Sequence, residues 1–522
     1  MALPLGQRLA QWRLPALLGL AATVVGVAWS GRPSFWWDEA ATVSMADRSL
    51  RSTLATLGHV DAVHGLYYVL IHWWFQVFGV SEFSARAPSA LAVGIATAAL
   101  VALARMFGGT RLGVIVGVTF MVLPRVTWAA TEARSYAMVL ALSTVTMLVL
   151  VCSLRTSKRA WWILYGVLAA VSVALFLYSA VLLLVHAVIV VFGAKVIPDA
   201  DSKRNRFKGL CFVGASASAV LLVSPLIALS LGQSRQVSWI PPLDRHIFTT
   251  IAVDQWFLSS PLFAVVAGII VLSGIAGYFF APSRWTVGDR SASTVALVWI
   301  LVPMALFLVY SVVLGNIYVD RYVIFTAPGV ALLLGVMISR LTSSWVLASA
   351  AVILLAAASL PAYVSQREPW GKSGGMDYST AADFLKANGN AGDCVAFQPV
   401  VSWAPSSLHA VAEARPDSIK GLRDIGLEHD ANSIDELWDS EYSVDETAER
   451  AQGCQTVWVV TDGERQSYEA ILHTANVVWN FEPFHFIDTE LFTQLSVRGF
   501  VVETATPLHH LQIVQMVPST RR

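Results

Sequence analysis

Charged residues are scarce in this sequence of 522 amino acids. Asp, Glu, Lys and Arg make up 13% of the chain, whereas 56% of its residues are hydrophobic, and it holds 19 Trp and 24 Phe. A soluble domain usually carries about 25% charged residues. The scarcity excludes an ordinary soluble protein and a disordered chain, and the absence of excess positive charge excludes a nucleic-acid-binding protein.

The formal net charge of zero conceals two unlike parts. Residues 1–364 hold 24 Lys and Arg against 12 Asp and Glu, and residues 365–522 hold 11 against 23. The first part consists of long apolar stretches broken by short basic loops, and the second has the composition of an acidic, water-soluble domain. We therefore expect a membrane domain over 1–363, which includes a first outer loop at 31–85, and a soluble α/β domain over 364–522.

Eleven stretches are long and apolar enough to cross a membrane, which takes about 20 residues each. The expected spans are 14–30, 86–106, 111–130, 135–154, 160–178, 180–196, 210–231, 260–281, 292–313, 322–339 and 343–363. With a cytoplasmic N-terminus, 15 of the 24 basic residues fall inside and nine of the twelve acidic residues fall outside, as the positive-inside rule requires. The prediction is a multi-pass plasma-membrane protein with an extracytoplasmic C-terminal domain.

The sequence has only four cysteines. Cys152 and Cys211 lie near the expected inner ends of helices, and we expect them to serve as small apolar side chains. Cys394 and Cys454 lie in the outer domain, where an oxidising compartment allows a disulfide. We expect a Cys394–Cys454 bridge, with two unpaired buried thiols as the alternative. No cysteine has the spacing of a zinc ligand.

The C-terminal region alternates between strand-like and helix-like patterns. A helix is expected at 379–389, strands at 394–400 and 455–461, helices around 434–450 and 465–475, and a terminal hairpin at 499–517. This alternation predicts a small α/β sandwich. The region has neither a glycine-rich phosphate loop nor a nucleophile elbow, so nothing in it indicates catalysis.

Adjacent carboxylates, Asp38 and Glu39, follow Trp36 and Trp37 at the outer end of the first span. A carboxylate buried beside tryptophans can act as a general base. First-turn acids that favour a helix N-terminus are the alternative.

Further along the same loop, Asp61 and His64 lead into an aromatic stretch that contains Tyr67. They would position a sugar or a cation, or form a structural hydrogen bond. The segment 65–79 is expected to be an amphipathic helix in the membrane interface.

Two more polar clusters lie at outer ends of spans. One contains Arg125, Glu132, Arg134 and Tyr136, and the other contains Asp320, Arg321 and Tyr322. Charges beside a membrane are costly and usually functional, and arginine pairs well with phosphate. Ion pairing within a cluster and anchoring at the interface are the alternatives. The loop 232–258 is a weaker candidate for lining the same cavity. Asp and His are compatible with a divalent cation, although no ligand spacing requires one.

These segments resemble the GT-C-fold glycosyltransferases that use polyprenyl-phosphate sugars. The resemblance is to family 39-type bacterial members, related to protein O-mannosyltransferases and the lipid A aminoarabinose transferase. It is carried by the motifs WWDEA at 36–40, HGLYYVLIHWWFQVFG and SEFSARAPSAL at 64–91, TEARSYAM at 131–138 and DRYVIFTAPGVALLLG at 320–335.

The resemblance implies that Asp38 deprotonates an acceptor hydroxyl with support from Glu39, and that the anomeric centre inverts. Arg134 and Arg321 would meet the charge of the departing polyprenyl phosphate, while His64, Tyr67 and Tyr136 line the sugar or lipid-phosphate site. The partners implied are a polyprenyl-phosphate-linked sugar, membrane lipid, and a glycan, glycolipid or protein acceptor. An Ala-, Val- and Arg-rich composition of actinobacterial type favours mannose or arabinofuranose.

A transporter or flippase for lipid-linked saccharides is the main rival. It predicts inverted repeats and ionisable residues at the middle of the membrane. The sequence shows no such repeat, and its charges gather at the outer rim. A scaffold that presents the outer domain to partners would leave the carboxylates and arginines unexplained.

Overall fold

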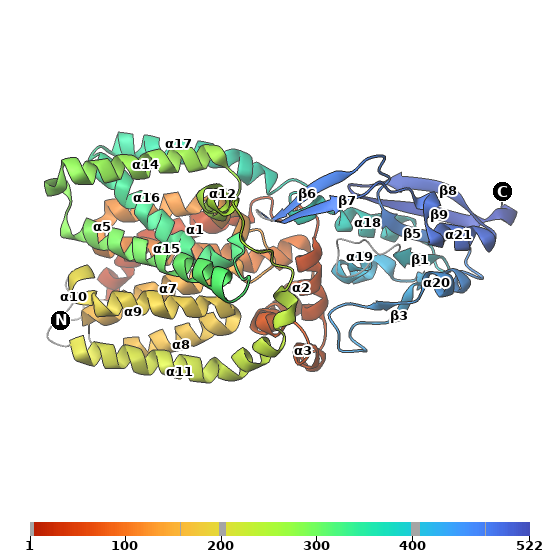
Figure 1. Cartoon of the computed structure of the whole chain (residues 1–522), viewed down its shortest axis with the longest axis horizontal. Helices are drawn as coiled ribbons and strands as arrows, with labels where there is room; N and C mark the ends of the chain where they lie inside the picture. Colours follow the sequence, from red (N-terminus) through yellow and green to blue (C-terminus); the bar gives the residue numbers. More distant parts are fainter. Residues whose placement is uncertain (1–4, 157, 198–204, 398–407, 475–476, 522) are drawn as a thin grey trace. The chain divides into compact units, whose positions relative to one another are not determined.

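A computed structural model describes residues 5–156, 158–197, 205–397, 408–474 and 477–521 (Figure 1). The chain forms two compact units. Unit 1 comprises Met1–Ser30 and Arg86–Ser365, and unit 2 comprises Gly31–Ala85 and Gln366–Arg522. The segment 31–85, expected as a loop of the membrane domain, therefore folds together with the C-terminal region.

Unit 1 is built from helices. They are α1 (Leu5–Val27), α5 (Glu82–Met121, whose first residues belong to unit 2), α6 (Pro124–Ala129), α7 (Tyr136–Thr156), α8 (Arg159–Leu175), α9 (Leu182–Val191), α10 (Gly193–Val196), α11 (Asn205–Gly232), α12 (Ile247–Thr249), α13 (Gln255–Phe257), α14 (Pro261–Phe280), α15 (Val287–Val313), α16 (Ala327–Leu341) and α17 (Trp345–Ser365). Short helical turns join them: η2 (Leu177–Val181), η4 (Ser234–Val237), η5 (Thr250–Asp254), η6 (Pro282–Arg284) and η7 (Asp320–Thr326).

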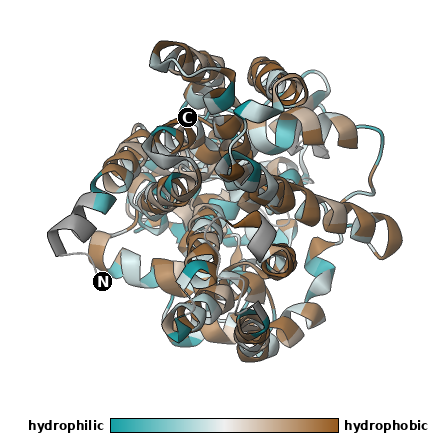
Figure 2. Ribbon diagram, turned by 90° about the vertical axis from the view of Figure 1, so that its left-hand side faces the viewer, coloured by the Kyte–Doolittle hydropathy of each residue, from teal (hydrophilic) through white to brown (hydrophobic). Residues whose placement is uncertain are grey.

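Hydrophobic residues cover much of these helices, as the brown ribbon in Figure 2 shows. Among the described residues, seven helices are long and apolar enough to cross a membrane, and three shorter apolar helices cover Gln11–Val27, Arg159–Leu175 and Leu177–Val191. Each of the eleven expected spans overlaps one of these ten helices. The chain is a polytopic helical membrane protein.

Two expected spans, 86–106 and 111–130, lie in the single long helix α5. The helix breaks at Gly108 and Gly109, and Gly109 has φ 68°, which residues with a side chain rarely adopt. Its second half ends at Met121, earlier than predicted, because Pro124 starts the separate helix α6. Proline lacks the N–H that a helix interior requires, but it fits the first turn.

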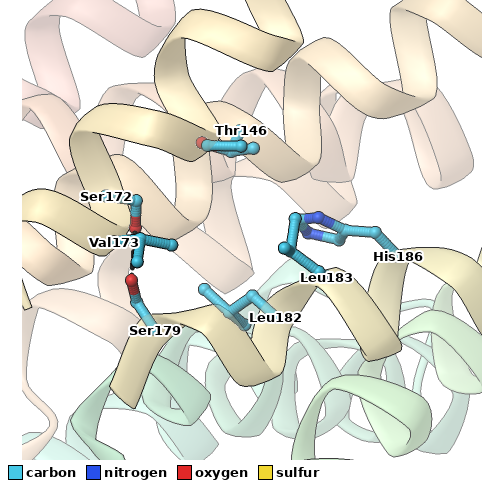
Figure 3. A pocket seen from close by; sticks show the side chains of 8 residues that line it. Thr146, Ser172, Val173, Ser179, Leu182, Leu183 and His186 are labelled. Atoms are coloured by element: carbon cyan, nitrogen blue, oxygen red, sulfur yellow. Dashed lines mark hydrogen bonds between the residues drawn. The ribbon is translucent and has the colours of Figure 1, made fainter. Parts of the chain in front are cut away.

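Within unit 1, α8 packs between α7 and α11, while α16 packs against α14 and α15 (Figure 1). A small cavity among α7, α8, η2 and α9 is lined by Thr146, Ser172, Ser179 and His186 (Figure 3). The Ser172 hydroxyl donates to Oγ of Ser179 at 3.0 Å. The cavity volume is about 10 Å³, room for about one water molecule, so it cannot hold a sugar.

Unit 2 combines helices with a mixed sheet. Its helices are α2 (Trp37–Asp47), α3 (Leu50–Leu57), α4 (Gly65–Phe78), α18 (Tyr378–Asn388), α19 (Ala410–Ala414), α20 (Val444–Arg450) and α21 (Glu490–Val497). Its strands are β1 (Cys394–Phe397), β2 (Arg423–Asp424), β3 (Leu427–His429), β4 (Ser440–Glu441), β5 (Val457–Asp462), β6 (Glu469–Thr474), β7 (Val477–Phe481), β8 (Phe500–Pro507) and β9 (Leu511–Pro518). Short turns are η1 (Ala62–His64), η8 (Ser373–Gly375), η9 (Pro416–Ile419), η10 (Phe486–Asp488) and η11 (Ser519–Arg521).

The main sheet has the strand order β2-β1-β5-β9-β8. Strand β1 runs parallel to β2 and β5, whereas β9 is antiparallel to β5 and β8. In register, Ala396 lies opposite Val459, and Val459 lies opposite Val514; all three are buried in the core. A disulfide joins Cys394, the first residue of β1, to Cys454, shortly before β5. The C-terminal region is thus an α/β domain, as predicted.

Most of the elements expected in this region are present. Helix α18, strand β5 and the β8–β9 hairpin match their predicted ranges closely, and β1 matches as far as Phe397, beyond which 398–400 fall outside the described residues. The helix predicted over 434–450 was half wrong, because only Val444–Arg450 is helical, starting at a Ser443–Glu446 capping box. The helix predicted at 465–475 was wrong: pairing with β7 makes Glu469–Thr474 a strand.

Candidate active site

The adjacent carboxylates lie in the first turn of α2. Trp36, the residue just before the helix, has an extended backbone and a buried side chain, and it ends the loop that leads into the helix. Side chains with negative charge are favoured in a first helical turn by the helix dipole. Glu39 is fully buried, whereas Asp38 is half-buried. Of the two predicted catalytic carboxylates, Asp38 is therefore the one nearer to solvent.

A buried lysine balances the charge of Glu39. Nζ of Lys372 lies 3.9 Å from Oε1 of Glu39, and both side chains are almost inaccessible. Lys372 comes from the segment between α17 and α18, far from α2 in the sequence. Sequence reasoning missed it, because a single lysine in the segment WGKSGG carries no pattern that points to a distant carboxylate.

Contacts from the C-terminal region hold α2 at both ends. The backbone N–H of Ser34 donates to the carbonyl oxygen of Pro369 at 2.8 Å. The rings of Trp37 and Trp438 lie 4.1 Å apart. At the other end, Arg48 donates to the carbonyl oxygen of Glu436 at 2.6 Å. The carboxylates are thus fixed on a framework that includes the C-terminal region.

The Asp61 cluster contains a structural hydrogen bond. The hydroxyl of Tyr68 donates to Oδ2 of Asp61, and Nε2 of His64 lies 3.8 Å from Oδ1 of the same carboxylate. Asp61 has φ 59°, a left-handed conformation that costs roughly 1–3 kcal/mol and is often found at functional sites. Tyr67 is buried, with its ring 6.3 Å from that of Tyr68. These residues form one connected cluster.

The predicted helix at 65–79 is present as α4. Its inner face buries Tyr67, Tyr68, Ile71 and Phe75. Its outer face exposes large hydrophobic side chains, namely Leu70, Trp73, Val77 and Phe78. An exposed apolar face of this kind suits a membrane interface.

In unit 1, Arg125 forms a buried ion pair with Asp320. Its guanidinium also donates to the backbone carbonyl oxygens of Gln255, at 2.8 Å, and Asp254, at 2.7 Å. Burial raises the pKa of the Asp254 carboxyl, which accepts a hydrogen bond from Ser259. The arginine thus ties α6 to η7 and to the segment around 254–255. Its charge is directed at Asp320 and two carbonyl groups.

Arg321 lies among aromatic rings. Its Nε donates to the hydroxyl oxygen of Tyr136 at 3.1 Å, and its guanidinium carbon lies 5.6 Å from the ring centres of both Trp239 and Tyr322. Trp128 extends the group, with its ring 5.2 Å from that of Tyr136. Arginine combines stacking with forked hydrogen bonding, a pairing suited to a phosphate ester.

Glu132 and Arg134 lie in the short turn between α6 and α7, and both are buried. The Ser89 hydroxyl donates to the backbone carbonyl oxygen of Glu132 at 2.5 Å and so anchors the turn to α5. The turn leads directly into Tyr136, the first residue of α7.

The predicted site residues are divided between the two units. Unit 1 contains Arg125, Glu132, Arg134, Tyr136, Asp320, Arg321 and Tyr322, and unit 2 contains Asp38, Glu39, Asp61, His64 and Tyr67.

Unit 1 also contains a hollow of about 230 Å³. It is lined by parts of the loop 232–258, by the end of α15 and by the segment before η7, including Ser234, Ser238, Tyr310 and Asn316. Ligand pockets usually measure about 300–1,000 Å³. The hollow is thus too small to hold a lipid-linked sugar by itself.

No protein-family model matches the sequence, and no curated protein matches it significantly. The fold, however, is similar to that of solved structures along almost the whole chain. A crystal structure of ArnT from Cupriavidus metallidurans bound to undecaprenyl phosphate matches with a TM-score of 0.57 and 14% identity, covering 96% of this chain and 97% of that one. The apo structure of ArnT matches with a TM-score of 0.61 and 11% identity, covering 97% and 98%. The fold is of the GT-C type.

Proposed function

We propose that this protein is a membrane glycosyltransferase that moves a sugar from a polyprenyl-phosphate donor to a hydroxyl group of a cell-envelope acceptor. The reaction takes place on the outer face of the plasma membrane and inverts the anomeric centre. Mannose and arabinofuranose are the proposed donor sugars, and the acceptor is a glycolipid, polysaccharide or protein.

The observation that carries the proposal is the full-length fold similarity to ArnT, one structure of which holds undecaprenyl phosphate. The similarity includes the C-terminal α/β domain, because at least 96% of each chain is covered. A fold can host many functions, so the proposal also depends on the chemistry of the candidate residues.

Asp38 is proposed as the general base. It removes the proton of the acceptor hydroxyl while the acceptor oxygen attacks the anomeric carbon of the donor. The half-buried position of Asp38 supports this role, since a base must reach substrate and yet be partly shielded from water. Glu39, fully buried beside Lys372, supports the turn and does not exchange protons with the substrate.

Arg321 and Arg134 are proposed to stabilise the departing polyprenyl phosphate. The bond between the anomeric carbon and the phosphate oxygen breaks, and the electron pair stays on the phosphate, where positive charge lowers the barrier. Arg125 has a structural role in this proposal, because Asp320 and two carbonyl oxygens occupy its guanidinium. Tyr136, His64 and Tyr67 line the sugar or lipid-phosphate site.

The test is a transfer assay with the full chain in lipid nanodiscs. Radiolabelled decaprenyl- and undecaprenyl-phosphate sugars are supplied with a crude envelope acceptor extract, and both sugar incorporation and release of polyprenyl phosphate are measured. We expect equal amounts of the two products from wild-type protein and little of either from Asp38→Asn. Equal transfer by the two proteins would refute the base assignment.

The same preparation in sealed vesicles tests the rival function. A flippase moves the intact donor between leaflets and releases no polyprenyl phosphate. Movement of a fluorescent polyprenyl-phosphate sugar without sugar transfer to any acceptor would overturn the glycosyltransferase proposal.

A further inference from the structure

A histidine and several carboxylates that are not among the proposed catalytic residues gather in unit 2. His409 immediately precedes α19, and Glu413 lies four residues later on the same helix face. Asp439 immediately precedes β4. One ligand atom from each of these three residues lies within 4.8 Å of the other two, the one such group among the residues that the structure describes.

The imidazole is oriented by a carboxylate behind it. Nε2 of His409 lies 2.6 Å from Oδ2 of Asp424, at the end of β2. The other oxygen of Asp424 accepts the backbone N–H groups of Gly426 and Leu427, both at 3.0 Å. This directs Nδ1 toward Asp439, whose Oδ2 is 2.6 Å away. A carboxylate that holds one ring nitrogen while the other faces ligands is the usual outer shell of a metal-bound histidine.

One carboxylate oxygen of the cluster is left without a hydrogen bond among the described residues, although Arg48 and Ser44 interact with Glu413. Oε2 of Glu413 is buried and has no hydrogen-bond partner within the described part of the chain. The backbone N–H of Asp439 donates to the other oxygen, Oε1, at 3.3 Å and so brings a second carboxylate beside Glu413. A buried carboxylate oxygen without a partner, next to a second carboxylate, favours a bound cation.

We propose that His409, Glu413 and Asp439 bind a divalent transition-metal ion of the zinc class. One imidazole nitrogen and two carboxylate oxygens match the ligand preference of zinc and leave a fourth position for water. Ligand atoms on one tetrahedral zinc ion lie about 3.3 Å apart, so Nδ1 and Oδ2 of Asp439 must separate by less than about 1 Å.

Metal binding displaces protons at this site. Burial alone would lower the pKa of His409, but its hydrogen bonds to Asp424 and Asp439 raise that pKa well above the ordinary value. The ion takes the place of the proton between Nδ1 and Asp439, and Glu413 loses its proton as it coordinates. Affinity therefore falls as the pH is lowered.

The site would stabilise the framework around α2. Helix α19 packs directly against α2. Arg48, just after α2, donates to the carbonyl oxygens of Glu436 and Leu437, at the start of the segment that carries Asp439. A metal ion that joins Asp439 to α19 therefore fixes both surfaces on which α2 rests. This role is independent of the proposed transferase activity.

The experiment measures zinc in the purified full-length protein, freed of any histidine tag, by mass spectrometry and by titration after treatment with a chelator. We expect about one zinc per chain, a melting temperature that rises when zinc is restored, and little response to calcium or magnesium. Cobalt substitution should give visible absorption bands of a four- or five-coordinate site.

Variants separate a metal site from a purely hydrogen-bonded cluster. Glu413→Gln should weaken zinc binding at least 100-fold, and Asp424→Asn, a positioning change, by about 10- to 100-fold. His429→Ala, which changes an exposed histidine of the same unit, should bind zinc normally. Folded wild-type protein that binds no zinc, or a Glu413→Gln variant that binds it as tightly as wild type, would overturn the proposal. Because His409→Ala can fail to fold, the conclusion is drawn from Glu413→Gln.

Discussion

Unit 1 and unit 2 each contain a buried pair of opposite charges next to a residue with a proposed role in sugar transfer, and the two pairs differ. In unit 1, Arg125 contacts Asp320 directly and donates to two backbone carbonyl groups as well. In unit 2, Lys372 lies 3.9 Å from Glu39, a looser contact between a compact ammonium group and a fully buried carboxylate. In both units a third charged residue adjoins the pair in the sequence: Arg321 follows Asp320, and Asp38 precedes Glu39.

The comparison distinguishes charges that we expect to hold the fold from charges that we propose act on a substrate. A buried pair balances itself, so neither member is well placed to exchange a proton or bind a phosphate. The adjoining residue follows or precedes the pair directly in the sequence and is the one given a chemical role in the proposed reaction. We therefore expect substitutions of the pairs to affect mainly stability, and substitutions of Asp38 and Arg321 to affect mainly the reaction.

The largest effect is expected at Asp38. Asp38→Asn keeps the shape of the side chain but removes the base, so the rate of sugar transfer should fall by about 10²- to 10⁴-fold. The melting temperature in detergent should change little, since Asp38 is only half-buried. Single-turnover transfer from a labelled donor measures the rate.

Asp61→Asn provides the matched control, because this carboxylate belongs to the same segment and accepts a hydrogen bond from Tyr68. Asp61→Asn should slow transfer by less than about 10-fold. Removing a general base usually slows a reaction by at least about 10²-fold, so the two effects can be told apart. A loss at Asp61 as large as that at Asp38 would break the distinction between the two carboxylates.

The next largest effect concerns the tight pair. Arg125→Met leaves Asp320 buried without its cation and should lower the free energy of unfolding by about 3–5 kcal/mol. Arg125→Met combined with Asp320→Leu should recover most of that loss, because no charge then remains buried. Thermal unfolding in detergent micelles measures both, with Arg245→Met, at an exposed arginine, as the control. A single variant as stable as wild type would contradict the structural role given to Arg125.

The fold was largely predictable because its signal is local. Each apolar stretch specifies a helix by length and composition alone, and the β8–β9 hairpin is marked by two β-rich runs around a short turn. The helix predicted at 465–475 failed because its strand conformation depends on pairing with β7. Likewise, the association of 31–85 with 366–522 depends on contacts such as Trp37 with Trp438, which no local pattern encodes.

The sequence indicated candidate site residues, whose roles stay predictions, but it did not indicate their partners in the fold. Sequence position pointed to Asp38, Arg125 and Arg321, yet it could not show that Asp320 pairs with Arg125. Lys372 and the His409 cluster were missed for the same reason, since their partners come from segments brought together only by folding. The i, i+4 spacing of His409 and Glu413 was the one available signal, and such a pair is common without a metal.

A third prediction concerns Arg321. Arg321→Gln removes the charge and should lower kcat/KM for the donor by about 10²-fold, the usual cost of losing one group that stabilises developing charge. Arg321→Lys keeps the charge but loses the forked geometry, so it should retain more activity. Tyr136→Phe removes only the hydrogen bond to Nε and should cost less than either. If Arg321→Gln transfers sugar normally, the phosphate role belongs elsewhere, with Arg134 as the first alternative.

The smallest effect is expected at the looser pair, Lys372 and Glu39. Lys372→Met should lower the free energy of unfolding by about 1–3 kcal/mol, less than Arg125→Met, because a cation 3.9 Å away, beyond hydrogen-bond distance, stabilises a carboxylate less than a direct contact does. Glu39→Gln together with Lys372→Met should be close to wild type in stability and within about 10-fold in transfer rate, below the loss that removing a general base produces. Differential scanning fluorimetry and the single-turnover assay measure the two quantities on the same samples.

If the double variant instead loses transfer as completely as Asp38→Asn while remaining folded, Glu39 takes part in the chemistry. The difference between the two pairs would then be one of function, with the looser contact leaving Glu39 able to exchange a proton.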